Sequence, residues 1–467
     1  MHATPSLPTA ASADLDALRA QLGGSLATPG DAAYDALRAS WNLTFDQRPA
    51  VVVEAADADD VVAALRFAAA HGLTVAVQST GHGAALTCDG GLLVRTGRMR
   101  DVAVDPAART LRVGAGARWT DVLPHTSPHG LAPLLGFNGH VGVAGYTLGG
   151  GLGWLGRKHG LAIDSVRALD LVLPDGSRVR ASAETEPELF WGVRGGGSNF
   201  GVVVELELEL VPAPELFGGM VLYPGARAAE VIAAYAAWIE TVPDEVTSSC
   251  AVIRIPPLPD VPEPLRGQTV VGIGACVLGD ASGAQKLLAP VRTLGDPVVD
   301  MMRPLGPGDL GEVAMDPVDP MPAAGHAELV RTLTPELQTL LASMAEGERP
   351  FAIVEVRHLG GALARAGATT PLAPLDGELM FHVEAATPPG PAGEAARAAV
   401  AQLAATLKPH ATGAMLPTFL GEVESGPDRI AQAYTPESRP RLAELKRTCD
   451  PDDRFRFGRP VPREWAG

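Results

Sequence analysis

Residues 51–83, VVVEAADADDVVAALRFAAAHGLTVAVQSTGHG, contain the pattern that decides the fold. An apolar, β-branched run is followed by apolar residues at helical spacing and then by a second apolar run. Asp57 suits the N-cap of that helix, and Gly72 suits the position just past its end. The stretch therefore predicts strand, helix and strand, with the loop at 79–83 leaving the C-terminal end of the second strand. Ligands commonly bind at this end, because backbone amides and helix ends converge there.

The chain that follows is predicted to form short strands joined by tight turns. After them the predicted secondary structure changes to a mixture of helices and strands. The turn signals DPAA and PDG predict two hairpins. GVVVELELELV, residues 201–211, alternates strictly and predicts a half-buried strand. Prolines at 212 and 214 mark a boundary, beyond which residues 215–415 mix helices with antiparallel strands. The fold class we predict is α+β, in two main domains.

The composition limits both the size of the protein and its partners. At 467 residues, 46% of them hydrophobic, the chain is long enough for two or three domains with sizeable cores. The net charge is −17 and no long basic run occurs, which argues against a nucleic-acid partner. No apolar run reaches about 18 residues, which argues against a membrane span. Residues 1–22 also lack the pattern of a secretory signal, so we expect a cytoplasmic protein.

The cysteines and histidines form no recognisable metal-binding pattern. The cysteines have no CxxC spacing, which favours reduced thiols; they are Cys88, Cys250, Cys276 and Cys449. The first lies six residues after His82, roughly 20 Å away in an extended loop, so a cysteine–histidine nucleophile pair is disfavoured. No nearby histidine stands at a two-ligand spacing from His82, so we predict no metal. His82 is then either structural or a neutral imidazole held beside a bound cofactor.

Three glycine-rich loops fall within one region of the chain: Ser79–Gly83, Gly149–Gly153 and Gly195–Gly201. Backbone amides in such loops can approach a pyrophosphate closely, because glycine has no Cβ atom. Each loop taken alone is more simply explained as a tight turn. Three of them together indicate one extended, phosphate-bearing ligand.

A dinucleotide-binding fingerprint is a weaker interpretation of the same glycines. Gly151, Gly153 and Gly156 have the GxGxxG spacing, with Asp175 about 20 residues further on. That fingerprint opens a long helix, whereas WLGRKHG offers less than two turns before Gly160. Asp175 also falls in a hairpin turn instead of at a strand end. We therefore rank a Rossmann-type site below a cradle of several loops.

Five motifs, spread over nearly the whole chain, carry a family resemblance. They are WNLTFDQRPAVVVEAADADDVVAALRFA, VQSTGHG, VGVAGYTLGGGLGWLGRKHGL, LFWGVRGGGSNFGVVVELEL and RLAELKRTCDPDDRFRFGRPV. They resemble motifs of the berberine-bridge-enzyme-like FAD-linked oxidoreductases, a branch of the vanillyl-alcohol-oxidase flavoproteins. The resemblance implies a PCMH-type FAD-binding domain with two α+β subdomains. It also implies a substrate domain built on an antiparallel sheet flanked by helices.

The resemblance implies a division of the chain into four parts. Residues 1–44 would be an N-terminal helical segment, and residues 45–214 would be the FAD-binding domain. Residues 215–415 would form the substrate domain. Residues 416–467 would be a C-terminal segment that returns to the FAD domain.

VQSTGHG is similar to the family's R-S-G-G-H loop, whose histidine is joined to the 8α-methyl group of FAD. His82 is by this resemblance the covalent anchor of FAD. The further cofactor-binding positions that the resemblance implies are Gln78, Ser79, Thr80, Gly81, Gly83, Asn138, Val141, Gly142, Gly145, Tyr146, Gly149, Gly150, Gly153, Gly201, Val202 and Val203.

The chain departs from the family pattern at three of these positions. Many relatives attach FAD a second time, through the cysteine of a C-P-x-V-G motif. The matching stretch here is NGHVG, which puts Asn138 in the place of that cysteine, so we predict attachment through His82 alone. Gln78 and Thr80 stand where the family loop has arginine and glycine.

FAIVEVRHLGG is similar to the family's E-x-R-x-L-G-G strand, which faces the flavin. Alternation along a strand puts Glu355 and Arg357 on one face and His358 on the other. The resemblance therefore implies Glu355 as general base, and the alternative is a solvated carboxylate on an edge strand. Tyr146 and Tyr434 have no confident match to the family's tyrosine bases, and we expect both to be structural.

The function that the resemblance implies is an FAD-dependent oxidase or dehydrogenase. A hydride would pass to flavin N5 from a C–H next to oxygen in an alcohol, phenol or polyketide-like small molecule, with molecular oxygen as acceptor. The setting would be secondary metabolism. Two alternatives remain at this point: an oxidative cyclisation or other tailoring reaction, and a non-catalytic flavin-binding module.

Overall fold

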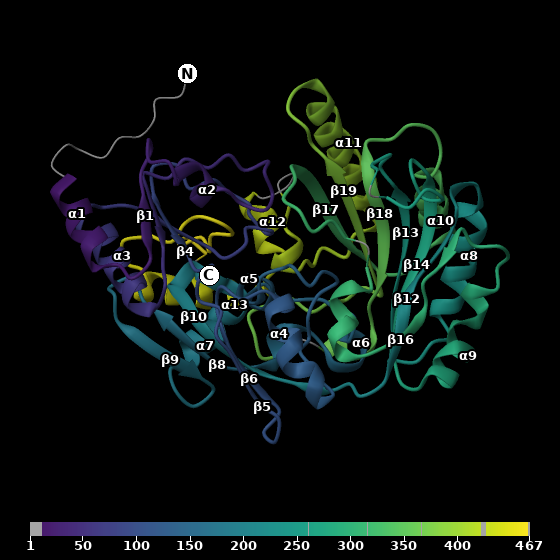
Figure 1. Ribbon diagram of the computed structural model, residues 1–467, viewed down its shortest axis with the longest axis horizontal. Helices are drawn as coiled ribbons and strands as arrows, with labels where there is room; N and C mark the ends of the chain where they lie inside the picture. The colour runs from purple at the N-terminus through teal and green to yellow at the C-terminus, as the bar shows by residue number, and fades with distance from the viewer. Residues whose placement is uncertain (1–11, 260, 315, 366, 422–425, 466–467) are drawn as a thin grey trace.

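The computed structural model describes residues 12–465 except 260, 315, 366 and 422–425. The first eleven residues of the expected N-terminal segment therefore lie outside the described residues. Two sheets occupy one side of the molecule and one large sheet the other (Figure 1). This mixed architecture, with antiparallel sheets flanked by helices, confirms the predicted α+β class.

The first sheet contains the stretch at 51–78, which forms strand, helix and strand as predicted. Its strand order is β1 (Ser25–Ala27), β2 (Val51–Glu54), β4 (Leu92–Arg95) and β3 (Val75–Gln78), and α3 (Ala58–Ala70) connects β2 to β3. β2 and β3 both pair parallel with β4, which lies between them. The Asp57 carboxylate caps α3 by accepting from the amides of Asp59 and Asp60, and Gly72 follows it at φ 63°.

The expected helical segment at 1–44 is not purely helical in its described part. It contains α1 (Ser12–Gln21) and α2 (Tyr34–Arg38), but β1 lies between them and pairs antiparallel with β2. Ser25 and Leu26 pair with Glu54 and Val53, so this segment adds an edge strand to the first sheet. The strand is only three residues long, too short for its alternation to be read from the sequence.

The second sheet has five antiparallel strands. Their order is β5 (Val102–Asp105), β6 (Thr110–Gly114), β10 (Val202–Glu209), β8 (Val166–Val172) and β9 (Arg178–Ser182). The DPAA and PDG turns connect β5 to β6 and β8 to β9, so both predicted hairpins are confirmed. The other elements of this side are β7 (Leu131–Ala132), β11 (Val211–Pro212), α4 (Trp119–Thr126), α5 (Val143–Leu148), α6 (Gly156–His159) and α7 (Pro187–Gly196).

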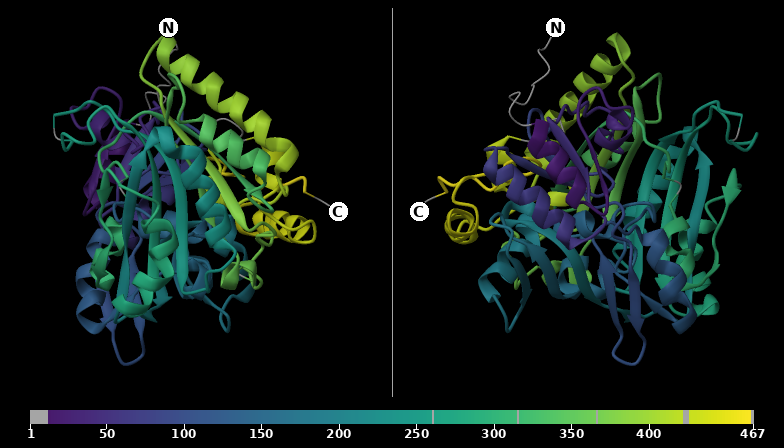
Figure 2. Two further views of the ribbon diagram at one scale, coloured as in Figure 1. Left: turned by 90° about the vertical axis from the view of Figure 1, so that its right-hand side faces the viewer. Right: turned by 60° about the vertical axis from the view of Figure 1, so that its left-hand side comes forward.

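The third sheet has eight strands and lies within residues 216–386. Its strands are β12 (Leu216–Pro224), β13 (Val246–Arg254), β14 (Thr269–Leu278), β15 (Val299–Asp300), β16 (Arg303–Leu305), β17 (Ala323–Val330), β18 (Phe351–His358) and β19 (Leu379–Ala386). The order is β15-β12-β14-β13-β18-β19-β17, with β16 also paired to β12. One face is covered by α8 (Ala228–Ile239), α9 (Ala281–Arg292), α10 (Pro335–Ser343) and α11 (Pro391–Leu407), of which α11 crosses β17 and β19 (Figure 2).

The two faces of this sheet differ in chemistry because successive side chains point in opposite directions. On β18, Val354 and Val356 lie in the core under the helices, whereas Glu355 and Arg357 point to the other face. β19 repeats the pattern, with Phe381 and Val383 in the core and His382 between them on the other face. The polar face is turned toward the first two sheets.

The C-terminal segment contains α12 (Pro427–Ala431) and α13 (Ser438–Cys449) and packs against the side that holds the first two sheets. The buried Lys446 ammonium on α13 donates to the Asn199 and Phe455 carbonyls and pairs with Asp450 at 2.6 Å. These contacts tie the segment to the loop at 195–201. No helix within the described residues is long and apolar enough to cross a membrane.

Candidate functional site

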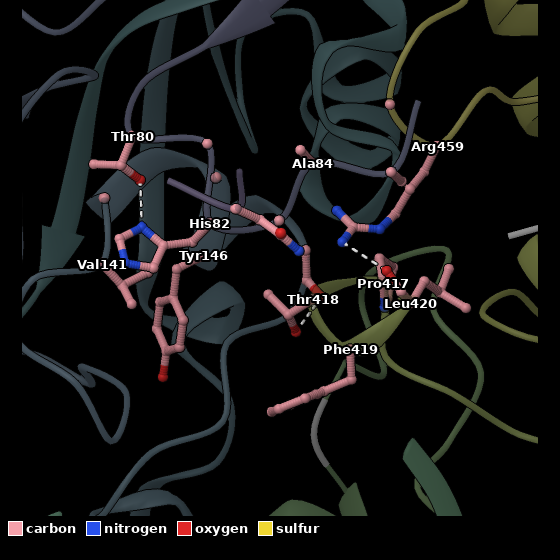
Figure 3. Close-up of a pocket in the computed structure, with 18 of the residues that line it drawn as sticks. Thr80, His82, Ala84, Val141, Tyr146, Pro417, Thr418, Phe419, Leu420 and Arg459 are labelled. Atoms are coloured by element: carbon pink, nitrogen blue, oxygen red, sulfur yellow. Dashed lines mark hydrogen bonds between the residues drawn. The ribbon is translucent and has the colours of Figure 1, made fainter. Parts of the chain in front are cut away.

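A cavity of about 450 Å³ lies where the polar face of the third sheet meets the loops of the other two. This volume is within the usual range of about 300–1,000 Å³ for small-molecule sites. Its walls come from the loop at 79–83, from α5 and the loop at 195–199, from β17, β18 and β19, and from the C-terminal segment. Figure 3 shows part of this lining. Residues from every part of the described chain thus converge on one site.

Most of the residues that the sequence predicted for the site line this cavity. They are Gln78, Ser79, Thr80, Gly81, His82, Gly83, Asn138, Val141, Gly142, Gly145, Tyr146, Gly149, Val203 and Glu355. Four predicted residues are not among its lining residues: Gly150, Gly153, Gly201 and Val202.

Close packing of the backbone accounts for the glycines that lie outside the lining. A Cβ atom on Gly153 would stand 1.6 Å from the Leu135 carbonyl oxygen, and one on Gly201 would stand 2.5 Å from the Val172 oxygen. Gly150 has φ 110°, a conformation that favours glycine. Val202 is buried in the core beneath the first sheet. A glycine needed for packing and one needed for a ligand look the same in a sequence.

The His82 imidazole is hydrogen-bonded at only one of its two ring nitrogens by the described residues. Its Nδ1 lies 2.8 Å from the Thr80 hydroxyl, and its ring stacks on Trp41 with centroids 4.4 Å apart. Its Nε2 is buried and has no hydrogen-bond partner among the described residues. Burial, with the charge of Arg118 as a smaller cause, lowers the pKa of His82 to about 4. The ring is therefore neutral near pH 7, with one nitrogen available to the cavity.

Three glycines leave space where a ligand could lie. A Cβ atom added to Gly145, Gly197 or Gly458 would meet no atom within 4 Å, and all three line the cavity. Gly145 belongs to α5, Gly197 to the GGGSNFG loop and Gly458 to the C-terminal segment. Their bare backbones form the kind of cradle that an extended phosphate-bearing ligand needs.

Arg459 is a cation of the cavity that the sequence reasoning missed. Its Nη2 donates to the Leu420 carbonyl at 3.2 Å, but its buried Nε has no hydrogen-bond partner among the described residues (Figure 3). Burial lowers its pKa to about 10, so it remains charged. The buried Ser79 hydroxyl also lacks a partner within the part of the chain described. Together they offer donors to an anionic ligand. The only sequence signal was an arginine after glycine in FGRPV.

Two departures from the family pattern have structural roles. The Gln78 amide donates to the Ala39 carbonyl, and its oxygen accepts from Gln47. Asn138 donates to the Pro317 carbonyl at 3.1 Å and accepts from the His140 amide at 2.7 Å. Both side chains thus join separate loops around the cavity.

Glu355 is a buried carboxylate at the sheet side of the cavity. β18 lies between β13 and β19, so the alternative of a solvated edge-strand carboxylate is wrong. Its Oε1 accepts from Arg357 Nε at 2.9 Å and Nη2 at 2.6 Å, and lies 3.0 Å from His382 Nδ1. Burial opposes ionisation, but Arg357 and His382 outweigh it and lower the pKa of Glu355 to about 2.

Aromatic and acidic residues that the sequence did not single out surround this pair. The Arg357 guanidinium lies 4.0 Å from the Phe137 ring centroid and 5.4 Å from that of Phe419. Asp316 also lines the cavity, and burial raises its pKa to about 6. Nothing in the sequence near Asp316 signals this position, since its loop reaches the site only through the tertiary fold.

The two tyrosines of the cavity have partners in the protein. The Tyr146 hydroxyl donates to the Leu134 carbonyl, and the Tyr434 hydroxyl donates to the Gly195 carbonyl at 3.0 Å. Burial raises the pKa of both. Each is therefore held as a protonated donor to the backbone.

The alternatives set aside in the sequence analysis find no support. Burial raises the pKa of the Cys88 thiol to about 12, which makes it a poor nucleophile. The Asp175 carboxylate accepts from Ser177 within the hairpin turn. No group of three or more potential metal ligands was found among the described residues.

Comparisons with known proteins agree with this site. The FAD binding domain family matches residues 49–182. The (R)-6-hydroxynicotine oxidase of Paenarthrobacter nicotinovorans is 28% identical over 451 residues, covering 93% of this chain and 95% of that protein. An FAD-linked oxidoreductase of Dictyostelium discoideum is 34% identical over 218 residues, 46% of this chain and 48% of its own.

Solved structures share the whole fold. The 6-hydroxy-D-nicotine oxidase of Arthrobacter nicotinovorans superposes with a TM-score of 0.81 at 26% identity, covering 95% of this chain and 98% of that one. The Physcomitrella patens BBE-like 1 structure gives 0.83 at 19% identity, covering 96% and 99%. The chain therefore contains an FAD binding domain, is similar over nearly its whole length to an FAD-dependent oxidase, and has the fold of the BBE-like structure.

Proposed function

We propose that this protein is an oxidase that carries FAD on His82 and oxidises a small molecule at a C–H bond next to oxygen. The observation that carries the proposal is the buried Nε2 of His82, which has no hydrogen-bond partner in the described part of the chain and lies on the same cavity as Glu355. With Nδ1 engaged by Thr80, Nε2 is the nitrogen that we propose for the bond to FAD. Secondary metabolism is the setting we propose.

The lining fits FAD in its donors and in its shape. We propose that Ser79 and Arg459 hold its anionic groups, because each has a buried polar atom there that no other described residue hydrogen-bonds. The open glycines would let its long axis lie against bare backbone. When bound, FAD supplies a two-electron acceptor that takes a hydride from carbon and passes the electrons on to oxygen, giving hydrogen peroxide.

At the opposite side of the cavity, the ion pair of Glu355 with Arg357 is buried. A carboxylate whose pKa is about 2 is a poor proton acceptor near pH 7. We therefore propose a positioning and electrostatic role for Glu355 in place of the general base implied by the resemblance. The Phe137 and Phe419 rings beside Arg357 would exclude water from the substrate.

We also propose the division of labour between the parts of the chain. Residues 45–214 hold the cofactor, residues 215–415 hold the substrate, and residues 416–467 close the cofactor site. The three sheets support this division. Within the described residues, the strands of the first two sheets all come from before residue 216, and those of the third sheet all come from 216–386.

The attachment is tested on the purified holoenzyme by acid precipitation and intact mass. We expect the yellow colour to stay with the precipitated chain, and the mass to exceed that of the bare chain by one FAD. FAD that is released by acid, with an intact mass equal to the polypeptide, would contradict attachment at His82.

The activity is tested by a screen with peroxide detection under air. The panel contains primary and secondary alcohols, sugars, and phenolic polyketide-like compounds. Peroxide formation with conversion of an alcohol to a carbonyl supports the oxidase. A ring-closed product instead supports a tailoring cyclase, and bound FAD that no compound reduces in the absence of air would indicate a non-catalytic module.

A further inference from the structure

We propose that His382 Nε2 is the proton acceptor of the reaction and that Glu355 is the residue that positions it. The proposal rests on the oxidase function proposed above and assigns the proton-transfer step of that same site. Glu355 and His382 are directly opposite each other in the β18–β19 pair, so both side chains stand on the polar face. Twenty-seven positions separate them in the sequence, and only the sheet register brings them together.

The hydrogen bond between the two side chains fixes which ring nitrogen is free. An ionised carboxylate can only accept hydrogen bonds. Glu355 is held ionised by two donors from Arg357, so the proton between Oε1 and His382 Nδ1, 3.0 Å apart, belongs to the imidazole. A neutral ring with its hydrogen on Nδ1 has its lone pair on Nε2. The carboxylate thus selects the tautomer that can accept a proton, as the third member of a catalytic triad does.

The Nε2 atom is placed to accept a proton from outside the protein. His382 lines the cavity, and its side chain is 12% exposed. Glu384 Oε1 lies 3.6 Å from Nε2, which is too long for a hydrogen bond. The Phe419 ring lies edge-on to the imidazole, with centroids 5.9 Å apart, and limits its rotation. The geometry therefore presents an oriented lone pair to a substrate in the cavity.

Acidic side chains flank both edges of the His382 ring. Glu355 and Glu384 are acids on either side of the ring, and Asp316 adds a third carboxyl to the same side of the cavity. The positive charge of Arg357 acts against these acids, but both of its hydrogen bonds go to Glu355, whose carboxylate neutralises it. His326 lines the cavity from β17 and lies beside Glu328. A proton on His382 is thus balanced by acids on both edges of the ring.

The remaining candidates for the proton acceptor are weaker. Tyr146 and Tyr434 donate their hydroxyl protons to backbone carbonyls. Asp316 lies on a connecting segment instead of a sheet strand, and no other described residue hydrogen-bonds its carboxyl as Glu355 bonds His382.

The step balances without a further reactant. The O–H bond of the substrate breaks and its proton goes to His382 Nε2. The C–H bond on the adjacent carbon breaks and its electron pair leaves with the hydrogen as hydride to FAD, so the substrate carbon becomes a carbonyl. The substrate is oxidised by two electrons, FAD is reduced by two, and oxygen takes them as peroxide, as proposed above.

The first experiment needs no substrate. Nitrogen NMR of the holoenzyme with labelled histidine, assigned with the His382→Asn variant, reports the tautomer. In the resting enzyme we expect a hydrogen on Nδ1 and none on Nε2, because the Glu355 carboxylate can only accept from Nδ1. A hydrogen on Nε2, alone or together with one on Nδ1, would overturn the proposal.

The second experiment follows flavin reduction in the absence of oxygen, with a substrate found by the peroxide screen. His382→Asn keeps a donor for Glu355 but has no basic nitrogen, so the rate of flavin reduction should fall at least about 100-fold. The fall of that rate toward low pH, the acid limb of the pH–rate profile, should disappear. Glu355→Gln removes the charge that stabilises the imidazolium, so the acid limb should move to lower pH. Exposed His125 on α4 gives the matched control, His125→Asn.

The outcomes separate this proposal from the one on which it rests. An acid limb that persists in His382→Asn and disappears in Asp316→Asn would assign the proton to Asp316 and overturn the proposal. If no compound reduces the bound flavin, the oxidase function fails, while the NMR experiment still decides whether His382 has the required tautomer. Retention of FAD by His382→Asn, seen as unchanged flavin absorbance, shows that a rate loss is not a loss of cofactor.

Discussion

At the residue scale, the chemistry of a side chain in this protein is set by what it touches. His82 and His382 both line the cavity. The first stacks on Trp41, and no described residue hydrogen-bonds its Nε2, whereas the second is bonded to a carboxylate through Nδ1. Glu355 has the position expected of a base, but its ion pair with Arg357 helps to lower its pKa to about 2, which makes it a poor proton acceptor near pH 7. The residue type alone does not distinguish these surroundings, and the roles proposed for the three residues follow from their contacts.

The role of His82 is tested by removing its nitrogen. We expect His82→Ala to release all of its FAD on acid precipitation, because no other cavity residue is predicted to form the bond. Cys88→Ala is the control, since this thiol is buried and has a raised pKa. We expect Cys88→Ala to keep its FAD, and loss of covalent FAD from that variant would show that the cysteine takes part.

The space beside Gly145 is tested with a size series. Gly145→Ala adds one methyl group to helix α5, where alanine is favoured over glycine by about 1 kcal/mol. We expect this variant to fold and to bind FAD weakly. Gly145→Leu should fold with a similar melting temperature but bind no FAD, because its side chain fills the cavity. Full FAD content in the leucine variant, measured by absorbance, would contradict the proposed cradle.

At the element scale, the C-terminal segment completes a site that begins four hundred residues earlier in the chain. Helix α13 buries Lys446, and the turn after it places Asp450 against the same ammonium. Asn199 accepts from Lys446 through its backbone and binds the Arg459 carbonyl and the Val461 amide through its side chain. One ion pair thus connects the glycine loop to the residues that line the cavity.

Breaking that ion pair should therefore affect both stability and cofactor binding. Lys446→Met leaves the Asp450 carboxylate buried without its cation, which costs about 3–5 kcal/mol in comparable cases. We expect a lower free energy of unfolding in urea, together with reduced FAD content at temperatures where the protein is still folded. Lys408→Met, at an exposed position after α11, is the control and should match the unchanged protein.

At the scale of the whole molecule, the cavity lies at the junction of two sheet systems, and the buried His358 contacts Arg157 across that junction. His358 points away from the cavity, and its Nε2 lies 2.9 Å from Arg157 Nη1, which also donates to the Leu359 carbonyl. Burial and the nearby Arg157 charge lower the pKa of His358 to about 3. Burial likewise lowers the pKa of His82, to about 4.

These shifts predict the pH dependence of stability. Between about pH 6.5 and pH 4 the unfolded chain binds protons at both histidines that the folded chain does not, so stability rises with pH. Each histidine contributes at most about 1.36 kcal/mol per pH unit. We expect His358→Gln to lose less stability than the unchanged protein between about pH 7 and pH 5. Urea unfolding at each pH measures this, with the exposed His125→Gln as control. If the free energy of unfolding changed equally with pH in the unchanged protein and in both variants, the lowered pKa of His358 would be contradicted.

The sequence by itself determined the local elements and the cofactor. The strand, helix and strand at 51–78, the two hairpins and the alternating strand near 202–209 follow from apolar spacing and turn residues, which act over a few positions. The motifs likewise predicted FAD and placed most of its loop residues.

Only the tertiary structure decided which groups meet. Glu355 and His382 share a hydrogen bond because β18 and β19 pair in one register, and a shift of one residue would turn His382 into the core. Arg459 and Asp316 reach the cavity by contacts between segments far apart in the chain, and such contacts leave no periodic signal in either segment. Gly153 and Gly201 resembled ligand-binding glycines because close backbone packing and close ligand approach both require the absence of a Cβ atom.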